Sequence, residues 1–475
     1  MIQKVFYFPQ IFPIFQEAHD FFVNTQKQTT TQHLFTNKQL RTLLIPIMVE
    51  QLLSSLMGTA DTMMVSNVGS AAISAVSLVD AINILVIQAL SALAAGGAIL
   101  CSQYLGSQNL KKAKRSAEQV LFVMLVLSCS LSLLCLIFRF PLLRLIFGTV
   151  DTDVMANSQI YFFFTLLSFP FIGLYDAGAS ILRAQNNTKG PMTISILSNF
   201  LNIGGNAILI FVFGMGVAGA AISTLVSRIF CAIVVIWQLR NPAEQIYVRN
   251  YFSIRPDWSL IKRVLFIGIP SGIENSMFQF GKLAIQSTVS TLGTVAIAAQ
   301  AMTSILEALN GIAAMGVGIG LMTVVGQCIG AKRKDEAIYY IKRLSWLSEI
   351  VILISCAVVY LLAKPVTILG GMEAESARLC LQMVSFITIT KPISWVLSFI
   401  PAYGMRAAGD VKFSMITSCA SMWLCRVSLC IFLCRFCGFG PIAVWIGMFA
   451  DWSVRAVVFM LRFHSRKWLQ HHVID

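Results

Sequence analysis

The chain has 475 residues and a net charge of +14; 57% of its residues are hydrophobic and 12% are charged. Soluble domains have roughly 45–50% apolar and about 25% charged residues, so this composition, with a mean hydropathy of +0.77, excludes a soluble protein. A basic excess would favour nucleic-acid binding in a soluble chain, but here it lies in loops between apolar segments. We therefore expect a membrane protein without a nucleic-acid partner.

Twelve apolar segments are long enough to cross a hydrocarbon core, which takes about 20 residues. In chain order, the predicted helices span residues 43–66, 71–103, 119–139, 157–182, 191–212, 217–239, 264–289, 295–327, 344–363, 379–405, 413–434 and 441–461. The second and the eighth are longer than one span requires, which indicates tilt or an extension beyond the bilayer. The sequence thus predicts an all-α polytopic membrane protein with twelve transmembrane helices.

Basic residues gather in alternate loops. One side of the membrane receives Lys111–Arg115, Arg240–Arg263 and Lys332–Lys334, whereas the opposite side holds few, such as Arg139 and Arg378. By the positive-inside rule the first side is cytoplasmic, and so are both termini. We expect a multi-pass protein of the cell (inner) membrane that contacts anionic lipids.

The segment from Ile45 to Ala113 recurs 224 positions later without a gap. Residues that rarely coincide by chance recur at this offset: Pro46 and Pro270, Glu50 and Glu274, Gly69 and Gly293, Gly96 and Gly320, Gln103 and Gln327, Gly106 and Gly330. A repeat of half the chain length in an apolar sequence is typical of secondary transporters. Because six helices return the chain to its starting side, the two halves should run parallel. They should be related by a pseudo-two-fold axis along the membrane normal.

This repeat divides the chain into two lobes of six helices and three flanking segments. We expect a cytoplasmic N-terminal extension at 1–40, an N-lobe at 41–240, a cytoplasmic hinge-like linker at 241–263, a C-lobe at 264–462 and a cytoplasmic tail at 463–475. The extension is either interfacial or disordered, or it reflects a start site assigned too early. Its apolar stretch is short and has no small-residue cleavage site, which argues against a signal peptide.

Polar residues at membrane depth are the candidates for function, because a charge at a helix centre costs about 2.5–3.5 kcal/mol on insertion scales. Asn199, Asn202 and Asn206 share one helix face by their spacing, and Asp61 lies at a similar depth on the first helix. Carboxylate and carboxamide oxygens suit a hard cation or a proton. The four residues are our predicted coupling-cation site; the alternative is that the asparagines only hydrogen-bond neighbouring helices.

Four further polar residues of the N-lobe are predicted to line the substrate route: Glu50, Asp80, Gln88 and Asp176. This lobe therefore looks acidic, without an obvious basic partner. We place cation coupling in it for that reason.

The C-lobe carries a polar cluster of both charges, Glu274, Gln279, Lys282 and Glu307, with Lys391 on the tenth helix. Lys282 needs a partner at this depth, and Glu307 is the expected one. This pair is either functional or a structural ion pair that fixes helix packing.

Motifs for other chemistry are missing from the sequence. All five histidines lie in the tails, and there is neither a P-loop nor an HExxH motif. Cys425, Cys430, Cys434 and Cys437 fit no standard zinc spacing. We predict no enzyme activity, no cofactor and no metal other than Na⁺ as a coupling ion.

Several segments of the chain resemble those of the multidrug and toxic-compound extrusion (MATE) transporters. The first helix matches through Pro46, Gln51, the run Thr59–Val65 (TADTMMV), Gly69, Ala72 and Val76. Arg183-Ala184-Gln185 with Gly190-Pro191, and the run Met405–Asp410 (MRAAGD), match the segments after the fourth and tenth helices. The resemblance extends from about Thr36 to Arg462.

The resemblance implies a V-shaped pair of six-helix lobes that alternates between inward- and outward-facing states. It also implies the export of organic cations and other amphipathic toxicants against an inward flow of Na⁺ or H⁺. In the branch with a first-lobe site, the aspartate falls on Asp61 and an asparagine on Asn202, whereas that branch's second acid falls on Asn206. The other branch's acids fall on Phe278 and near Trp395, so Glu274 does not inherit their role.

We therefore expect a cation-coupled (H⁺ or Na⁺) antiporter that exports small amphipathic, mostly cationic drugs or toxic metabolites by alternating access and functions as a monomer. A lipid-linked saccharide flippase of the same superfamily is the alternative, and it would need a basic cavity. An ion channel is less favoured, because the chain has a two-lobe repeat and lacks a filter-like segment.

Overall fold

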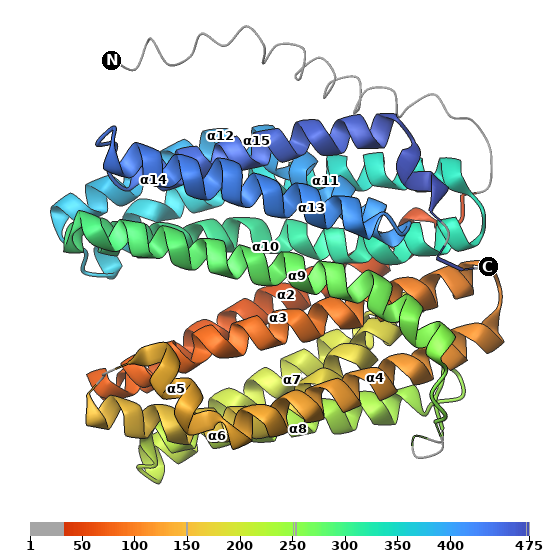
Figure 1. Ribbon diagram of the computed structural model, residues 1–475, viewed down its shortest axis with the longest axis horizontal. Helices are drawn as coiled ribbons and strands as arrows, with labels where there is room; N and C mark the ends of the chain where they lie inside the picture. Colours follow the sequence, from red (N-terminus) through yellow and green to blue (C-terminus); the bar gives the residue numbers. More distant parts are fainter. Residues whose placement is uncertain (1–32, 149–150, 250, 252–253, 472, 475) are drawn as a thin grey trace, which may run out of the picture. The chain divides into compact units, whose positions relative to one another are not determined.

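The computed structural model describes residues 33–148, 151–249, 251, 254–471 and 473–474. The described chain is helical throughout (Figure 1). Its elements are α2 Asn37–Ser66, α3 Ser70–Gly106, α4 Leu110–Ile137, α5 Arg139–Phe147, α6 Thr152–Ala184, α7 Lys189–Asn206, η3 Ala207–Val212, α8 Gly216–Leu239, α9 Trp258–Val289, η5 Ser290–Leu292, α10 Thr294–Gly330, α11 Lys334–Leu369, α12 Ala374–Ala407, α13 Val411–Ser421, η6 Met422–Val427, α14 Ser428–Arg435, α15 Ile442–His464 and η7 Lys467–Gln470.

Each of the twelve predicted helices has a counterpart, with α7–η3 and α13–η6–α14 each forming one long helix. Among the described residues, eleven helices are long and apolar enough to cross a membrane, and α9 is not among them. α4 and α11 begin well before the predicted positions 119 and 344. Both helices begin with charged residues, mostly basic in α4 and of both signs in α11, so a search for apolar residues misses these first turns. Asn109 caps α4 by accepting a hydrogen bond from the backbone N–H of Lys112 at 3.0 Å.

The chain forms two compact units, which we describe separately. The first unit contains residues 37–283 and 411–419, and the second contains 284–410 and 420–471 together with 33–36. The first part of α9 thus groups with the helices that precede it. The predicted lobe limits at 41–240 and 264–462 stay a prediction, and residues 1–32 of the predicted extension lie outside the described residues.

The predicted linker is attached to the first unit by specific hydrogen bonds. The backbone N–H of Ile246 donates to Gln185 at 2.7 Å, and Asn187 donates to Glu244 at 2.6 Å. Further along, Asp257 forms an ion pair with Arg115 at 2.9 Å. The described residues of this segment are therefore part of the first unit.

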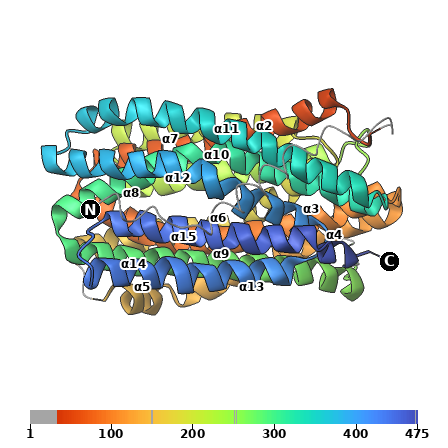
Figure 2. The same ribbon diagram turned by 90° about the horizontal axis from the view of Figure 1, so that it is seen from above.

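The two halves pack their helices in the same pairs. α3 packs on α4 and α6, α6 packs on α8 (Figure 1), and α7 packs on α8. In the other half α10 packs on α11 and α12, α12 packs on α15, and α14 packs on α15 (Figure 2). Both ends of α3 and α10, at 70–106 and 294–330, differ by the predicted offset of 224.

Left-handed turn residues repeat at the same offset. Gln108 and Lys332 have φ of 58° and 60°, an uncommon conformation for residues other than glycine. Gly214 and Gly438 have φ of 64° and 66°, where the missing Cβ removes the steric conflict. The helix limits, the packing pairs and these turns confirm the internal repeat.

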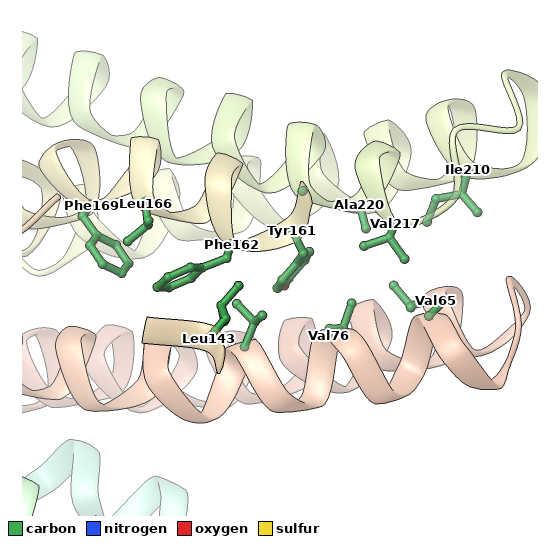
Figure 3. Close-up of a cluster of buried hydrophobic side chains, with 13 residues drawn as sticks. Val65, Val76, Leu143, Tyr161, Phe162, Leu166, Phe169, Ile210, Val217 and Ala220 are labelled. Atoms are coloured by element: carbon green, nitrogen blue, oxygen red, sulfur yellow. The ribbon is translucent and has the colours of Figure 1, made fainter. Parts of the chain in front are cut away.

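An apolar cluster of the first unit holds the helices around the polar residues of that unit. Phe162, Leu166 and Phe169 of α6 are fully buried, and Phe162 points toward Leu143 (Figure 3). Tyr161 belongs to the same cluster, yet its hydroxyl reaches Asp80 on α3 at 3.2 Å. Packing in this cluster therefore holds the Tyr161 hydroxyl next to the carboxylate of Asp80.

Candidate functional site

Asp61 of α2 meets two of the three predicted asparagines of α7, Asn202 and Asn206. Asn206 Nδ2 donates to Asp61 Oδ1 at 2.6 Å and lies 3.5 Å from Asn202 Oδ1. Asn202 and Asn206 are fully buried, whereas Asp61 is partly exposed. A buried amide pair thus holds a carboxylate that remains accessible.

Two features of α7 and α8 complete this cluster. Asn202 and Asn206 lie four residues apart on one face of α7, and the π-helical turn Ala207–Val212 begins directly after Asn206. Such turns are rare and frequent at functional sites. Thr224 of α8 accepts a hydrogen bond from Asn202 at 3.4 Å, which the sequence reading missed because a threonine in an apolar helix is unremarkable.

The predicted third asparagine does not join the cluster. Asn199 is buried, precedes Asn202 by three residues on α7, and makes no hydrogen bond to the other members within the described chain. The cluster that the structure brings together is Asp61, Asn202, Asn206 and Thr224. We call it the cation cluster.

The cation cluster offers oxygen atoms for a cation or a proton. Asn206 Oδ1 is buried and has no hydrogen-bond partner among the described residues. A buried amide oxygen without a partner costs about 1–3 kcal/mol, so a bound cation at this point would relieve a real penalty. The carboxylate of Asp61 supplies the charge, and the amide and hydroxyl oxygens are the neutral ligands that hard cations accept.

An arginine in the middle of α8 corrects our view that the first half lacks a basic partner. Arg228 Nη1 donates to Ser168 Oγ of α6 at 2.6 Å. Its charge interacts electrostatically with Asp80, Asp61 and Asp176. The signal was present in the sequence, since an arginine within a predicted span is itself a candidate for function.

The predicted route residues have different surroundings. Asp80 accepts hydrogen bonds from Asn83 at 3.1 Å and from Tyr161 at 3.2 Å. Asp176 accepts one from Ser91 at 2.5 Å, and Gln88 is exposed on α3. Their place on a substrate route stays a prediction.

Glu50 also has a basic partner. Its Oε1 lies 3.0 Å from Arg183 and accepts a hydrogen bond from Tyr175 at 3.2 Å. Glu50 is only 3% exposed, so it links α2 to α6 in the packed interior of the first unit. Its predicted place on the route also stays a prediction.

In the second unit, Glu307 of α10 pairs with Lys391 of α12. Lys391 Nζ donates to Glu307 Oε1 at 2.7 Å and to the Glu307 backbone carbonyl at 3.1 Å, and it is fully buried. The sequence did not suggest this partner, because the choice between two lysines needs the tertiary structure. Lys282 is exposed on the first unit's part of α9, and the predicted Lys282–Glu307 pair stays a prediction. Glu274 is buried and Gln279 partly exposed on the same helix.

A second charged group in this unit was also missed. Asp451 of α15 accepts a hydrogen bond from Ser421 at 2.6 Å and lies 3.7 Å from Arg426 and 3.9 Å from Arg455. All three charged side chains are buried. The interior of the second unit thus contains more basic than acidic groups around this aspartate, whereas the polar interior of the first unit contains more acidic than basic ones.

Comparison with known proteins gives consistent relatives. The MatE family model matches residues 46–208 and again 270–432, a second match that begins 224 positions after the first. The uncharacterized transporter YisQ of Bacillus subtilis (strain 168) is 27% identical over 432 residues, which cover 90% of this chain and 93% of that protein. The probable multidrug resistance protein NorM of Thermotoga maritima is 26% identical, with 92% and 94% covered.

A solved structure agrees in fold. The outward-facing conformation of a multidrug resistance MATE family transporter of the MOP superfamily superposes with a TM-score of 0.82 at 21% identity, covering 92% of this chain and 98% of that one. The double match of the family model falls on the two halves of the repeat, and it covers well over half of the chain. The chain therefore belongs to the MatE family of multi-pass membrane transporters, which are not enzymes.

Proposed function

We propose that the protein is a cation-coupled antiporter that exports small amphipathic, mostly cationic compounds. The single observation that carries the proposal is the cation cluster. In it, the Asp61 carboxylate accepts a hydrogen bond at 2.6 Å from the amide nitrogen of buried Asn206, whose amide oxygen has no hydrogen-bond partner among the described residues. This arrangement is suited to binding and releasing one H⁺ or Na⁺.

Coupling requires that the cation bind one conformation better than the other, because a ligand shifts an equilibrium only by its differential affinity. Asp61 lies near the end of α2, and its ligands come from α7 and α8, so a small shift among three helices would open or close the set. Cation or proton binding at Asp61 favours the state that releases substrate outside. Release of the cation favours the state that loads substrate.

Relatives and topology support the remaining parts of the proposal. NorM of Thermotoga maritima is described as a probable multidrug resistance protein, which favours small drug-like substrates. The basic loops favour a cell (inner) membrane protein with both termini in the cytoplasm. Six helices in each half carry a complete repeat, so a single chain suffices, and we propose that it functions as a monomer.

The flippase alternative needs a basic cavity for a pyrophosphate group. The buried basic groups among the described residues of the second unit are Lys391, Arg426 and Arg455, and each is at most 5% exposed and lies beside a carboxylate. These basic groups pair with carboxylates in the packed interior of the unit. The accessible charge near the cation cluster is acidic, which suits a cation better than a diphosphate.

The experiment is exchange of a fluorescent organic cation in proteoliposomes under an imposed H⁺ or Na⁺ gradient. Asp61→Asn should abolish gradient-driven exchange, because the amide cannot change charge, while the protein stays folded. Asn199→Ala is the matched control, since Asn199 lies on the same α7 face but outside the cation cluster. Exchange that survives in Asp61→Asn would refute the site, and a lack of gradient-driven flux with any amphipathic cation would refute the antiporter.

A further inference from the structure

A cavity of about 550 Å³ lies at the end of α8 in the first unit. Six residues line it: Asn187, Trp237, Gln238, Arg240, Asn241 and Glu244. Most of them come from the last turn of α8 and the segment that follows it, and all belong to the first unit. The volume falls within the range of about 300–1,000 Å³ that is typical of ligand pockets.

Hydrogen bonds give this cavity a defined shape. Asn187 Nδ2 donates to Glu244 Oε1 at 2.6 Å, and the backbone N–H of Gly190 donates to Asn187 Oδ1 at 3.1 Å. The side chain of Asn241 accepts a hydrogen bond from the backbone N–H of Ala243 at 3.1 Å. The beginning of α7 is thereby joined to the segment after α8, so the walls of the cavity are held in place by the protein itself.

Two of the lining residues are charged, and their charges have opposite signs. Arg240 is exposed, and its guanidinium lies over the ring of Tyr251, 5.8 Å from the centroid. Glu244 is partly buried and accepts the hydrogen bond from Asn187. Within the described chain neither Arg240 nor Glu244 forms an ion pair, so both charges are available to a ligand. A cavity with one unpaired charge of each sign is suited to a zwitterion.

A neutral lining residue adds a hydrogen-bond acceptor that lacks a donor. Gln238 Oε1 is buried against Gly190 and has no hydrogen-bond partner among the described residues. A buried acceptor without a donor is costly, and rotation of the amide into the cavity would let it accept from an N–H group of a ligand. With the carboxylate of Glu244, the cavity thus offers two acceptors to a primary ammonium. A trimethylammonium group has no N–H and cannot use them.

The outer face of α8 indicates that the ligand is a lipid. Val226, Ile233 and Trp237 are exposed, and their spacing places them on one face of this helix. Because α8 is long and apolar enough to cross a membrane, an exposed apolar face on it contacts acyl chains. Trp237 lines the cavity at the end of this face, and tryptophan is enriched where a membrane meets water. The cavity therefore lies where the acyl chains of a phospholipid end and its head group begins.

We propose that this cavity binds the head group of a zwitterionic phospholipid with a primary ammonium group, represented by phosphatidylethanolamine. Arg240 pairs with the phosphate, because a guanidinium matches the geometry of phosphate oxygens. Glu244 and Gln238 accept hydrogen bonds from the ammonium. The acyl chains lie along Ile233 and Trp237. An anionic head group such as that of phosphatidylglycerol has no ammonium for Glu244, so it fits less well.

The test measures lipid binding to the purified full-length protein by native mass spectrometry, which distinguishes bound lipids by their mass. The delipidated protein is offered phosphatidylethanolamine, phosphatidylcholine and phosphatidylglycerol with the same acyl chains at equal concentration. The wild type should bind phosphatidylethanolamine at least about tenfold more tightly than phosphatidylcholine, because only the former donates hydrogen bonds to a charged group. Soluble glycerophosphoethanolamine at the same concentration should not displace the lipid, since it lacks the acyl chains.

Variants assign this preference to the cavity. Glu244→Gln should lower the preference for phosphatidylethanolamine over phosphatidylcholine about tenfold. Arg240→Gln should weaken binding of all three lipids, because all three contain the phosphate, and Trp237→Ala should do the same. Two controls carry matched changes outside the lining. Arg249→Gln removes a positive charge from the same segment, and Trp258→Ala removes a tryptophan that is 71% exposed, against 72% for Trp237. Both controls should bind as the wild type.

Several outcomes would overturn the inference. These are equal binding of phosphatidylethanolamine and phosphatidylcholine by the wild type, tighter binding of phosphatidylglycerol, or a preference that survives Glu244→Gln. Losses in the controls as large as those in the cavity variants would show unspecific attraction instead. Displacement by glycerophosphoethanolamine would identify a soluble ligand. If Glu244→Gln does not fold, Arg240→Gln decides, because Arg240 is exposed and its unchanged lipid binding would contradict the site. No transport is measured, so the result is independent of the proposed antiport.

Discussion

Replacement of Arg183 by methionine should destabilise the first unit, because it leaves the carboxylate of Glu50 buried without its counter-charge. The Glu50 side chain is 4% exposed and lies 3.0 Å from Arg183 Nη2. Removal of one partner of a buried ion pair costs about 3–5 kcal/mol. Because the Arg183 side chain is 16% exposed and the Tyr175 hydrogen bond to Glu50 remains, we expect the lower end, about 3 kcal/mol.

A double-mutant cycle isolates the pair. Glu50→Gln alone leaves a partly exposed arginine and should cost about 1–2 kcal/mol. The double variant contains no buried charge at this point, so its loss should fall short of the sum of the single losses by about 2 kcal/mol. Denaturant unfolding of the four proteins in detergent gives these values. Additive losses would refute an ion pair, and a stable Glu50→Gln protein that no longer transports would place Glu50 on the substrate route.

Two further predictions concern packing and turns. Phe162→Ala, in the fully buried cluster of α6, should lose about 2 kcal/mol in the same unfolding assay, less than in a soluble core because lipid replaces water around the separated helices. Phe200→Ala, at a side chain 74% exposed on α7, is its control and should change little. Gly214→Ala should cost about 1 kcal/mol, since φ is +64° and no atom obstructs the new Cβ. Gly204→Ala, in a helix with equal space, should be neutral or stabilising, and a loss there would contradict the backbone explanation.

Long apolar segments and the recurrence of Pro46, Glu50 and Gly69 after 224 residues were enough to predict the helices and their repeat. Apolar residues mark only the part of a helix that lies in the hydrocarbon core. Hydropathy therefore located the spans but not their polar extensions. The first turns of α4 and α11 are charged, and α5, with 9 residues, is too short to span a membrane. These parts are set by contacts outside the hydrocarbon core, which an apolar pattern does not report.

The candidate site was predicted only in part, because the sequence shows spacing within one helix but not how neighbouring helices are rotated against each other. Helical spacing brought Asn202 and Asn206 to one face, and matching depth brought Asp61 to them. Thr224 and Arg228 come from α8, whose rotation about its own axis follows from packing on α6 and α7. The partner of Glu307 likewise depended on which lysine the packing of α10 on α12 brings near.

The repeated left-handed turns mean that the chain contains its own homologue. The stretch from Gln108 to Gly214 is as long as the stretch from Lys332 to Gly438, so insertions and deletions cancel across several helices and loops. Asn83 in α3 and Glu307 in α10 therefore occupy equivalent backbone positions, as do Gly58 in α2 and Lys282 in α9. At each equivalent position, the residue in one half is a side chain that the same backbone conformation carries in the other half. Exchanging residues between the halves thus provides a set of substitutions that this backbone has already accommodated.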